Sequence, residues 1–504
     1  MLEENGKSEK TPGPQTLPPL DRWQYRLIPL EWPVDPVETE TVLGDWRLQV
    51  GADLPLWPIT DCDGVPAGFL LGYPIALRDV ATAVWISGAH KSSAKLGGDR
   101  NAFVDAVFNE LAGRFLWVCD CGAGVRVYTD CAGQIPCVFD TERGIVGSTA
   151  HALMTDSDYQ SRFDQVLYDR LGVEGLGWLP GGLTAHRGLS RLLPNHMLDP
   201  NRMAVSRQWP PGPIAETADT SAAVSKMAAL IEAQIAAIIE GAGRTVAQAL
   251  TAGRETRMLL GCARPLKDKI DLVTVAGDDQ YKVDTVMAQR IAEEEGLRHR
   301  KLPRVQASDE ARKLYLRRGG HCIADANANY FPSVHPIAES HVFVGGAGGE
   351  IGRGFFWRSG DHGDLRLSGE NLVNRFGLSP EPRLIAEMEK WVEGLSGFDA
   401  LSVLDLAYVE QRMGPWSGAQ FCNDPTLVRM APLLNRQLVE IMLSLPSSWK
   451  RSEKMTDAIL ETTWPELERY PYNSLGVFKD VIMRVQRVLS DPGIVVRKLR
   501  KKLF

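Results

Sequence analysis

The sequence predicts two fold classes in one chain: an α+β N-terminal part built as a layered sheet, and an α/β C-terminal part with a parallel sheet and a helical end. Apolar residues mostly alternate in the first part, whereas in the second they recur at helical spacing between short apolar runs. A proline cluster, Trp209-Pro210-Pro211-Gly212-Pro213, separates the two patterns, because proline interrupts both helices and central strands. We therefore predict a disordered lead-in over 1–19, a first domain over 20–212 and a second over 213–504.

The composition indicates a soluble globular protein. The chain has 504 residues, 44% of them hydrophobic, and its formal net charge of -7 lacks the basic excess of a general nucleic-acid binder. No run approaches about 18 uninterrupted apolar residues, so we expect no membrane span. Residues 1–19 lack the apolar stretch of a signal peptide, which favours a cytoplasmic location. The eight cysteines show no pair of CxxC motifs, which argues against a disulfide scaffold and a structural zinc site.

Two consecutive strands are predicted in the first domain. In the first strand, alternating residues would share one buried face: Phe115, Trp117, Cys119 and Cys121. The two cysteines would then be small core residues. Gly122–Gly124 ends this strand, and a second strand over Val125–Tyr128 leads into a turn over 129–133. Repeated units of this kind predict layered sheets.

The second domain alternates strands with helices. Helical spacing is carried first by Val224, Met227, Ile231, Ile235 and Ile238, up to Gly241, and again by Val283, Met287 and Ile291, up to Gly296. A third helix begins near Thr256, and short apolar runs predict strands over Val246–Leu250, Leu272–Ala276 and His341–Val344. Nearly continuous apolar strands between helices are typical of a parallel sheet covered on both faces. From about Pro380 the chain is predicted to be helical, with Leu384, Met388, Trp391 and Leu395 on one face and further helices over 438–445 and 481–489.

Two small-residue loops follow predicted strands, where open α/β sheets bind their ligands. The first, Leu250–Arg257, leads directly into a helix, whose N-terminus favours phosphate, and Glu255 could hold Mg²⁺ through hard oxygen atoms. The second, Val344–Glu350, offers a glycine surface and one carboxylate. Each loop alone is also compatible with an ordinary turn.

The string Thr251-Ala252-Gly253-Arg254-Glu255-Thr256 resembles the Ser-Gly-Gly-x-Asp-Ser pyrophosphate loop of the asparagine synthetase family, which belongs to the N-type ATP pyrophosphatases. Gly346, Gly348 and Glu350 are similar to the family's Gly-Asp-Gly-x-Asp-Glu segment, with Ala347 replacing the first acid. Further segments resemble family motifs in the same order: Arg114–Pro136 the central glutaminase strands, Leu189–Trp209 the end of that domain, and Arg429–Pro446 a helical segment after the synthetase site.

The resemblance implies an Ntn-hydrolase-like N-terminal domain and a synthetase domain that uses ATP and Mg²⁺. It implies an AMP-forming C–N ligase that joins a small-molecule or peptide carboxylate to an amine. Glu255 and Glu350 would hold the metal, and the nucleotide would contact Leu250, Thr251, Ala252, Gly253, Arg254, Thr256 and Gly346. The oligomeric state and the two substrates are not predicted.

Several positions depart from the family pattern. Leu2 stands where the family carries its glutaminase cysteine, so we expect no glutamine hydrolysis, as in the β-lactam synthetase branch. Ala252 is unsuited to a positive φ angle. Asp457 replaces the family's catalytic lysine, and Lys450 or Lys454 could supply that charge or be solvated surface residues.

Two alternatives remain open at this point. The same departures are compatible with a non-catalytic homologue that acts as a nucleotide-binding or accessory subunit in a biosynthetic pathway. His321-Cys322 could suggest a base and a nucleophile, but neighbouring side chains on a strand point to opposite faces, so we expect a structural role. The nine histidines show no metal-ligand spacing.

Overall fold

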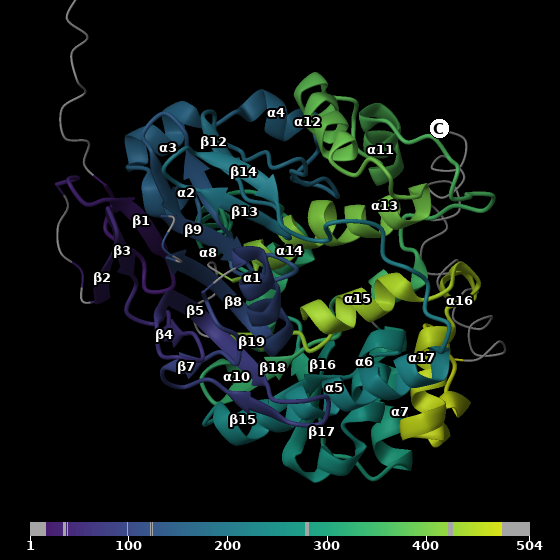
Figure 1. Cartoon of the computed structure of the whole chain (residues 1–504). Coiled ribbons are helices and arrows are strands. Elements are labelled where there is room, and N and C mark those ends of the chain that lie inside the picture. The colour runs from purple at the N-terminus through teal and green to yellow at the C-terminus, as the bar shows by residue number, and fades with distance from the viewer. Residues whose placement is uncertain are drawn as a thin grey trace, which may run out of the picture.

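The computed structural model describes residues 17–33, 37, 39–97, 99–120, 122, 124–277, 282–421 and 427–475. Two sheets with mainly antiparallel strands form the N-terminal half, and a parallel sheet lies in the C-terminal half (Figure 1). The predicted combination of a layered antiparallel part and a parallel α/β part is therefore confirmed. The predicted segment 481–489 and the residue Cys121 lie outside the described residues.

The N-terminal sheets have six and eight strands, in the orders β12-β10-β11-β1-β3-β2 and β14-β13-β9-β8-β5-β4-β7, with β6 paired to β5. The first contains β1 (Tyr25–Pro29), β2 (Thr39–Leu43), β3 (Trp46–Val50), β10 (Val138–Asp140), β11 (Ile145–Gly147) and β12 (Leu189–Arg191). The second contains β4 (Leu56–Thr60), β5 (Pro66–Leu77), β6 (Ala83–Trp85), β7 (His90–Lys91), β8 (Leu111–Asp120), β9 (Val125–Thr129), β13 (His196–Asp199) and β14 (Ala204–Arg207). Four helices accompany them: α1 (Arg100–Glu110), α2 (Ala150–Leu153), α3 (Asp156–Arg162) and α4 (Gln165–Arg170).

The predicted alternation on β8 is confirmed for its described residues. Phe115, Trp117 and Cys119 lie in one buried cluster with Phe103 and Phe108 of α1, because every second side chain of a strand points to the same face. Cys119 is also disulfide-bonded, which the sequence interpretation as a simple small core residue did not anticipate.

The C-terminal sheet has five parallel strands in the order β17-β16-β15-β18-β19. They are β15 (Thr245–Ala249), β16 (Ile270–Ala276), β17 (His299–Pro303), β18 (His341–Val344) and β19 (Val428–Met430). Strands β15, β16 and β18 match predicted strands. The two edge strands were missed, since β17 buries only Leu302 fully and β19 has three residues. The segment from Arg429 therefore starts as a strand and becomes helical only at Arg436.

Helices cover both faces of this sheet. Val246 and Leu272 pack in the main core with residues of α5 (Thr220–Gly241), α6 (Arg254–Cys262) and α7 (Lys282–Glu294), while Ala247 and Val273 face the cluster that includes α10 (His335–Ala338). The other helical elements are η1 (Arg264–Lys269), α8 (Asp309–Arg318), α9 (Ala326–Tyr330), η2 (Phe331–Val334), η3 (Gly349–Arg353), α11 (Gly369–Phe376), α12 (Pro382–Glu393), α13 (Ala400–Ala407), η4 (Tyr408–Met413), α14 (Gly414–Ala419), α15 (Arg436–Ser444), α16 (Ser447–Arg451), α17 (Lys454–Thr463) and η5 (Pro465–Arg469).

Helix α5 bears on the expectation that the chain has no membrane span. Its 22 residues are long and apolar enough to cross a membrane, although polar residues interrupt the apolar run. Half of its most apolar stretch is buried inside the protein, and its Gln234 side chain donates a hydrogen bond to the carbonyl of Pro432. These contacts are typical of a core helix.

The proline cluster lies between β14 and α5, and buried contacts link the two halves on either side of it. The Glu410 carboxylate is fully buried and accepts hydrogen bonds from Arg207 at 2.7 and 2.8 Å. Asn195 and Trp391 donate to the same carboxylate at 3.2 and 2.7 Å. Although burial opposes ionisation, the positive charge of Arg207 lowers the pKa of Glu410 below its usual value. The carboxylate therefore ties strand β14 and the residue that precedes β13 to helix α12.

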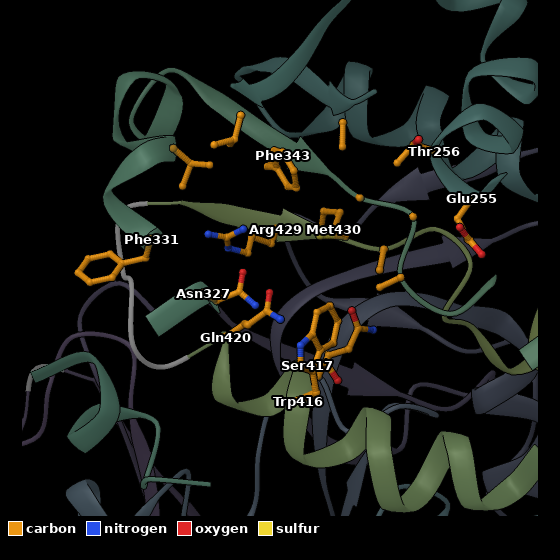
Figure 2. A pocket seen from close by; sticks show the side chains of 18 of the residues that line it. Glu255, Thr256, Asn327, Phe331, Phe343, Trp416, Ser417, Gln420, Arg429 and Met430 are labelled. Atoms are coloured by element: carbon orange, nitrogen blue, oxygen red, sulfur yellow. The ribbon is translucent and has the colours of Figure 1, made fainter. Parts of the chain in front are cut away.

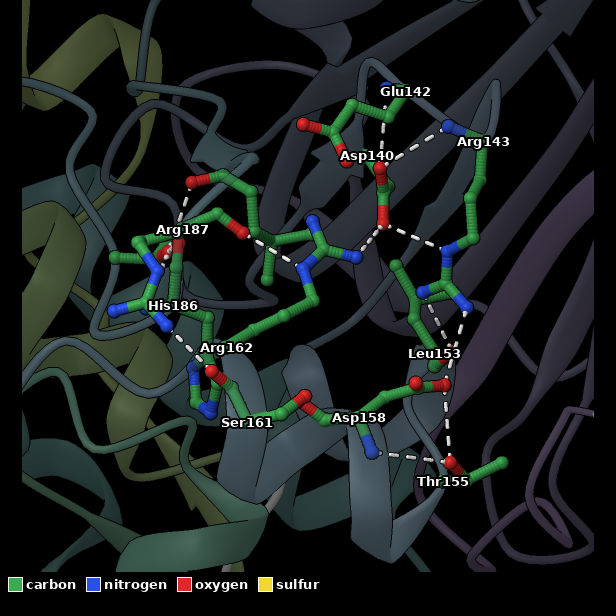
Figure 3. Close-up of polar contacts among 12 residues, drawn as sticks. Asp140, Glu142, Arg143, Leu153, Thr155, Asp158, Ser161, Arg162, His186 and Arg187 are labelled. Atoms are coloured by element: carbon green, nitrogen blue, oxygen red, sulfur yellow. Dashed lines mark hydrogen bonds and ion pairs between the residues drawn. The ribbon is translucent and has the colours of Figure 1, made fainter.

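A second buried carboxylate organises the first sheet (Figure 3). Asp140 pairs with Arg143 at 2.8 Å and with Arg162 at 2.5 Å, and it accepts the backbone amide of Glu142. Burial acts to raise the pKa of Asp140, but the two guanidinium groups outweigh it and the pKa is lowered. The pair with Arg162 fixes α3 to strand β10.

His321 and Cys322 do not lie on a strand, contrary to our interpretation. They follow α8 in a turn where His321 has a φ angle of 51°. Both side chains are internal, and the His321 ring packs among those of Tyr159, Phe163 and Tyr168. The expected structural role fits this aromatic cluster, but the geometric reason for it was wrong.

Two histidines of this cluster should make stability depend on pH. Burial lowers the pKa of His186 to about 3 and that of His321 to about 4, whereas an unfolded histidine has a pKa near 6.5. Between the folded and the unfolded pKa values, the unfolded chain binds more protons than the folded chain. The stability contributed by the two neutral histidines is therefore complete above pH 6.5 and is lost as the pH falls. We expect the unfolding temperature to decrease from pH 7 to pH 5.

His186→Phe is the matched variant for this prediction. Both ring nitrogens of His186 lack a hydrogen-bond partner among the described residues, so a phenyl ring removes the titrating group without breaking a hydrogen bond. The decrease in unfolding temperature between the two pH values should be smaller in the variant. An equal decrease in both proteins would contradict the assignment.

Candidate functional site

The two loops singled out from the sequence meet at one edge of the parallel sheet. Strands β15 and β18 are neighbours, with Gln248 opposite Val344, so their carboxyl ends open to the same side. A Cβ atom at Gly346 would lie 2.8 Å from the Cβ of Glu255, so only glycine permits this approach. The first turn of α6 and the glycine segment, which the sequence singled out separately, therefore lie side by side.

Glu255 and Glu350 share one arginine partner. The Arg353 guanidinium lies 2.8 Å from Glu255 and 3.5 Å from Glu350, and its other nitrogen lies 3.8 Å from Glu453. Burial and the nearby Glu350 charge raise the pKa of Glu255, while Arg353 acts in the opposite direction. No sequence pattern had indicated Arg353, which compensates the two carboxylates in this structure.

The donor set suits Mg²⁺ only if a ligand supplies further oxygen atoms. In the described ranges no group of three or more His, Cys, Asp or Glu side chains could hold a metal ion. The Oε2 atom of Glu350 is buried and has no hydrogen-bond partner within those ranges. Mg²⁺ is commonly held by one or two carboxylates together with substrate phosphates, which is the arrangement that Glu255 and Glu350 permit.

The amides of the first loop are engaged in internal hydrogen bonds. Thr251 donates its amide to the Thr256 hydroxyl at 3.2 Å, and Gly253 donates its amide to the Thr251 hydroxyl at 3.0 Å. The amide of Ala252 donates to the carboxylate of Asp284 at 2.9 Å, and burial raises the pKa of that carboxyl group. A phosphate group would have to displace Asp284 to reach this amide.

Two other loop residues differ from their expected roles. Ala252 does not adopt a positive φ angle, so its methyl group introduces no backbone strain. The side chain of Leu250 is fully buried in the core and its carbonyl accepts a hydrogen bond from the Thr274 hydroxyl at 2.5 Å. Leu250 therefore supports the strand end and offers no side-chain contact to a ligand.

Arg254 has its charge compensated by two acids. It pairs with Glu453 at 2.8 Å and with Asp457 at 3.0 Å, and its guanidinium stacks 3.9 Å from the Tyr472 ring centroid. The hydroxyl of Tyr472 donates to Asp457 at 2.8 Å. Asp457, at the position where the resemblance implies a lysine, thus forms an ion pair with Arg254 and supplies no positive charge itself.

Among the described residues, neither candidate lysine forms an ion pair with Glu255 or Glu350. Lys450 is buried, pairs with Asp405 at 2.6 Å and donates to the carbonyl of Leu443 at 2.9 Å, so the surface-lysine alternative is wrong for this residue. Burial raises the pKa of Asp405 to about 6, although Lys450 opposes that shift. Lys454 is exposed at the start of α17. Neither lysine lines the cavity described next.

A cavity of about 470 Å³ lies along the carboxyl edge of the sheet (Figure 2). Glu255, Thr256 and Glu350 line one part of it. Its other lining residues include apolar side chains and polar groups of distant segments: Arg114, Gln134, Val275, Asn327, Phe331, Val334, Phe343, Trp416, Gln420, Arg429, Met430 and Leu434. Figure 2 shows Arg429, Asn327 and Gln420 on the side away from Glu255.

The sequence did not indicate Asn327, Trp416 or Gln420 as site residues. Asn327 belongs to α9, Trp416 belongs to α14 and Gln420 directly follows α14; none of these segments carries a repeated motif. Arg429, Met430 and Leu434, in contrast, lie in one segment that had been singled out, and Arg114 and Gln134 lie in another. A scan against protein-family models and a search of curated proteins find no match for the chain.

Proposed function

We propose that the protein is an ATP-dependent, AMP-forming ligase of the asparagine synthetase type, with an Ntn-hydrolase-like N-terminal half, acting in the cytoplasm. The observation that supports it best is that Glu255 and Glu350 share one arginine partner beside a cavity at the carboxyl edge of a parallel sheet. The two residues come from the two loops that resemble motifs of that family. Its ligands would be ATP and a small-molecule or peptide carboxylate and amine, with no nucleic acid.

In this reaction the substrate carboxylate attacks the α-phosphorus of ATP and pyrophosphate leaves. The amine then attacks the activated carbon, AMP leaves and the amine loses a proton. Bound Mg²⁺ would neutralise phosphate charge, and Glu255 and Glu350 are the residues that would hold it. The cavity would orient the two reactants, which is a main task of the protein in such chemistry.

A non-catalytic homologue is the second candidate, and specific contacts favour it. Arg353 already compensates both carboxylates, and Asp284 already accepts the amide of Ala252. Of the two candidate lysines, Lys450 is committed to Asp405 and Lys454 is exposed, and neither lines the cavity. Such a protein would bind a nucleotide or an acid without turnover, as an accessory subunit in a biosynthetic pathway.

Incubation with Mg-ATP and a panel of carboxylic acids, with hydroxylamine as a general amine, separates the two candidates. The ligase should release AMP and pyrophosphate in equal amounts and form a hydroxamate in the presence of its acid. Glu255→Gln serves as the control for a contaminating activity, because it retains the fold but removes a carboxylate ligand. ATP binding without pyrophosphate release for any acid would support the non-catalytic candidate.

A further inference from the structure

One side of the cavity carries cationic and amide groups that the proposed chemistry does not use. The Arg429 side chain comes from the middle of the short strand β19, and its guanidinium lies 5.6 Å from the centroid of the Phe343 ring. Along the described chain, no carboxylate forms an ion pair with it. Gln420 lines the same cavity, and its Nε2 atom is buried with no hydrogen-bond acceptor in the part that the structure describes. An uncompensated cation and an unsatisfied buried donor favour an anionic ligand.

A local network fixes the neighbouring side chains. Asp325 accepts the indole N–H of Trp416 at 2.9 Å, and it also accepts the backbone amide of Asn327 at 2.9 Å and its side-chain amide at 3.0 Å. Trp416 and Asn327 are thereby held in place before any ligand binds. Since fewer side chains must be ordered on binding, this part of the cavity is preorganised.

The wall between the two sides is largely apolar. Phe343, Met430 and Leu434 line it together with Val275, Val334 and Trp416. Aromatic and aliphatic walls with a few fixed polar groups are typical of sites for small molecules with an apolar body. One guanidinium and one amide donor match the two oxygen atoms of a carboxylate.

We propose that Arg429 and Gln420 bind the carboxylate of an acid with an aromatic or branched apolar body, which packs between Trp416 and Phe343. Its other end then faces Glu255, on the opposite side of the cavity in Figure 2, and Glu350, which lines the same cavity. The group that reacts is therefore a second one, at the far end of the same substrate. This last step rests on the proposed ligase function, whereas the carboxylate site does not.

The test uses 4-phenylbutanoate and its primary amide as probes, with calorimetric titration of the full-length protein. We expect the acid to bind the wild type at least about tenfold more tightly than the amide. Arg429→Gln should remove this preference. Gln420→Glu, which keeps the shape of the side chain and places a negative charge beside the probe, should remove it as well. Arg78→Gln, an exposed arginine outside the cavity, is the control and should behave like the wild type.

The proposal is overturned if the wild type binds the amide as well as the acid, if it binds neither, or if Arg429→Gln keeps the preference. Gln420→Glu gives an independent answer should Arg429→Gln not fold, as judged by circular dichroism. Pyrophosphate release from Mg-ATP is measured separately. A preference for the carboxylate without pyrophosphate release would support this site and contradict the ligase function. Pyrophosphate release without an Arg429-dependent preference would support the ligase function and contradict this site.

Discussion

Glu255→Gln is expected to weaken Mg-ATP binding about tenfold or more, which corresponds to about 1.4 kcal/mol. The variant keeps the shape of the side chain but removes one of two carboxylates beside the cavity, which leaves bound metal and phosphate charge less compensated. Stability without ligand should barely change, because burial already raises the pKa of Glu255 and disfavours its charged form. Calorimetric titration with Mg-ATP and a thermal unfolding scan measure the two effects.

Two variants complete this test. Glu255→Asp keeps a carboxylate at the same position and should retain binding. Arg353→Gln removes the guanidinium 2.8 Å from Glu255, so the Mg²⁺ concentration needed for half-maximal ATP binding should fall. Equal Mg-ATP affinity in the wild type and Glu255→Gln would remove the nucleotide site from this edge and favour the non-catalytic candidate.

Glu410→Leu is expected to produce the largest loss of stability, about 3–5 kcal/mol. The substitution leaves the Arg207 charge, with a side chain only 14% exposed, without its carboxylate and also deprives Asn195 and Trp391 of their acceptor. An unpaired buried charge is costly because it has lost its solvation without gaining a partner. Urea unfolding followed by tryptophan fluorescence measures the loss.

The double variant Glu410→Leu/Arg207→Met is the matched control. It removes both charges and should recover a large part of the stability, since replacing a whole buried ion pair by apolar side chains is often nearly neutral. A loss below about 1 kcal/mol in the single variant would show that water reaches Arg207 and that this pair does not hold the two halves together.

The sequence by itself determined the fold class of each half and the position of Glu255 and Glu350 after predicted strands. Apolar runs such as His341–Val344 and helical spacing such as that of Val224 to Ile238 are local signals, because one face of each element must be buried. The approach of Glu255 to Glu350 was also predictable, because both residues follow strands whose carboxyl ends share an edge when the strands are parallel and adjacent. Edge strand β17 left no such signal, as most of its side chains face solvent.

Only the tertiary structure decided what surrounds those residues. The ion pairs of Arg353 and the hydrogen bond from Ala252 to Asp284 join groups whose local sequences give no sign of each other. The sequence left Lys450 open to two interpretations, and its buried contact with Asp405 rules out the surface one. The cavity joins Arg429 of a strand to Gln420 near a helix end, and the polarity of such a site depends on which distant segments the fold brings together. Residue type and spacing along the chain carry no information about those distances, so the charge balance of the site follows from packing alone.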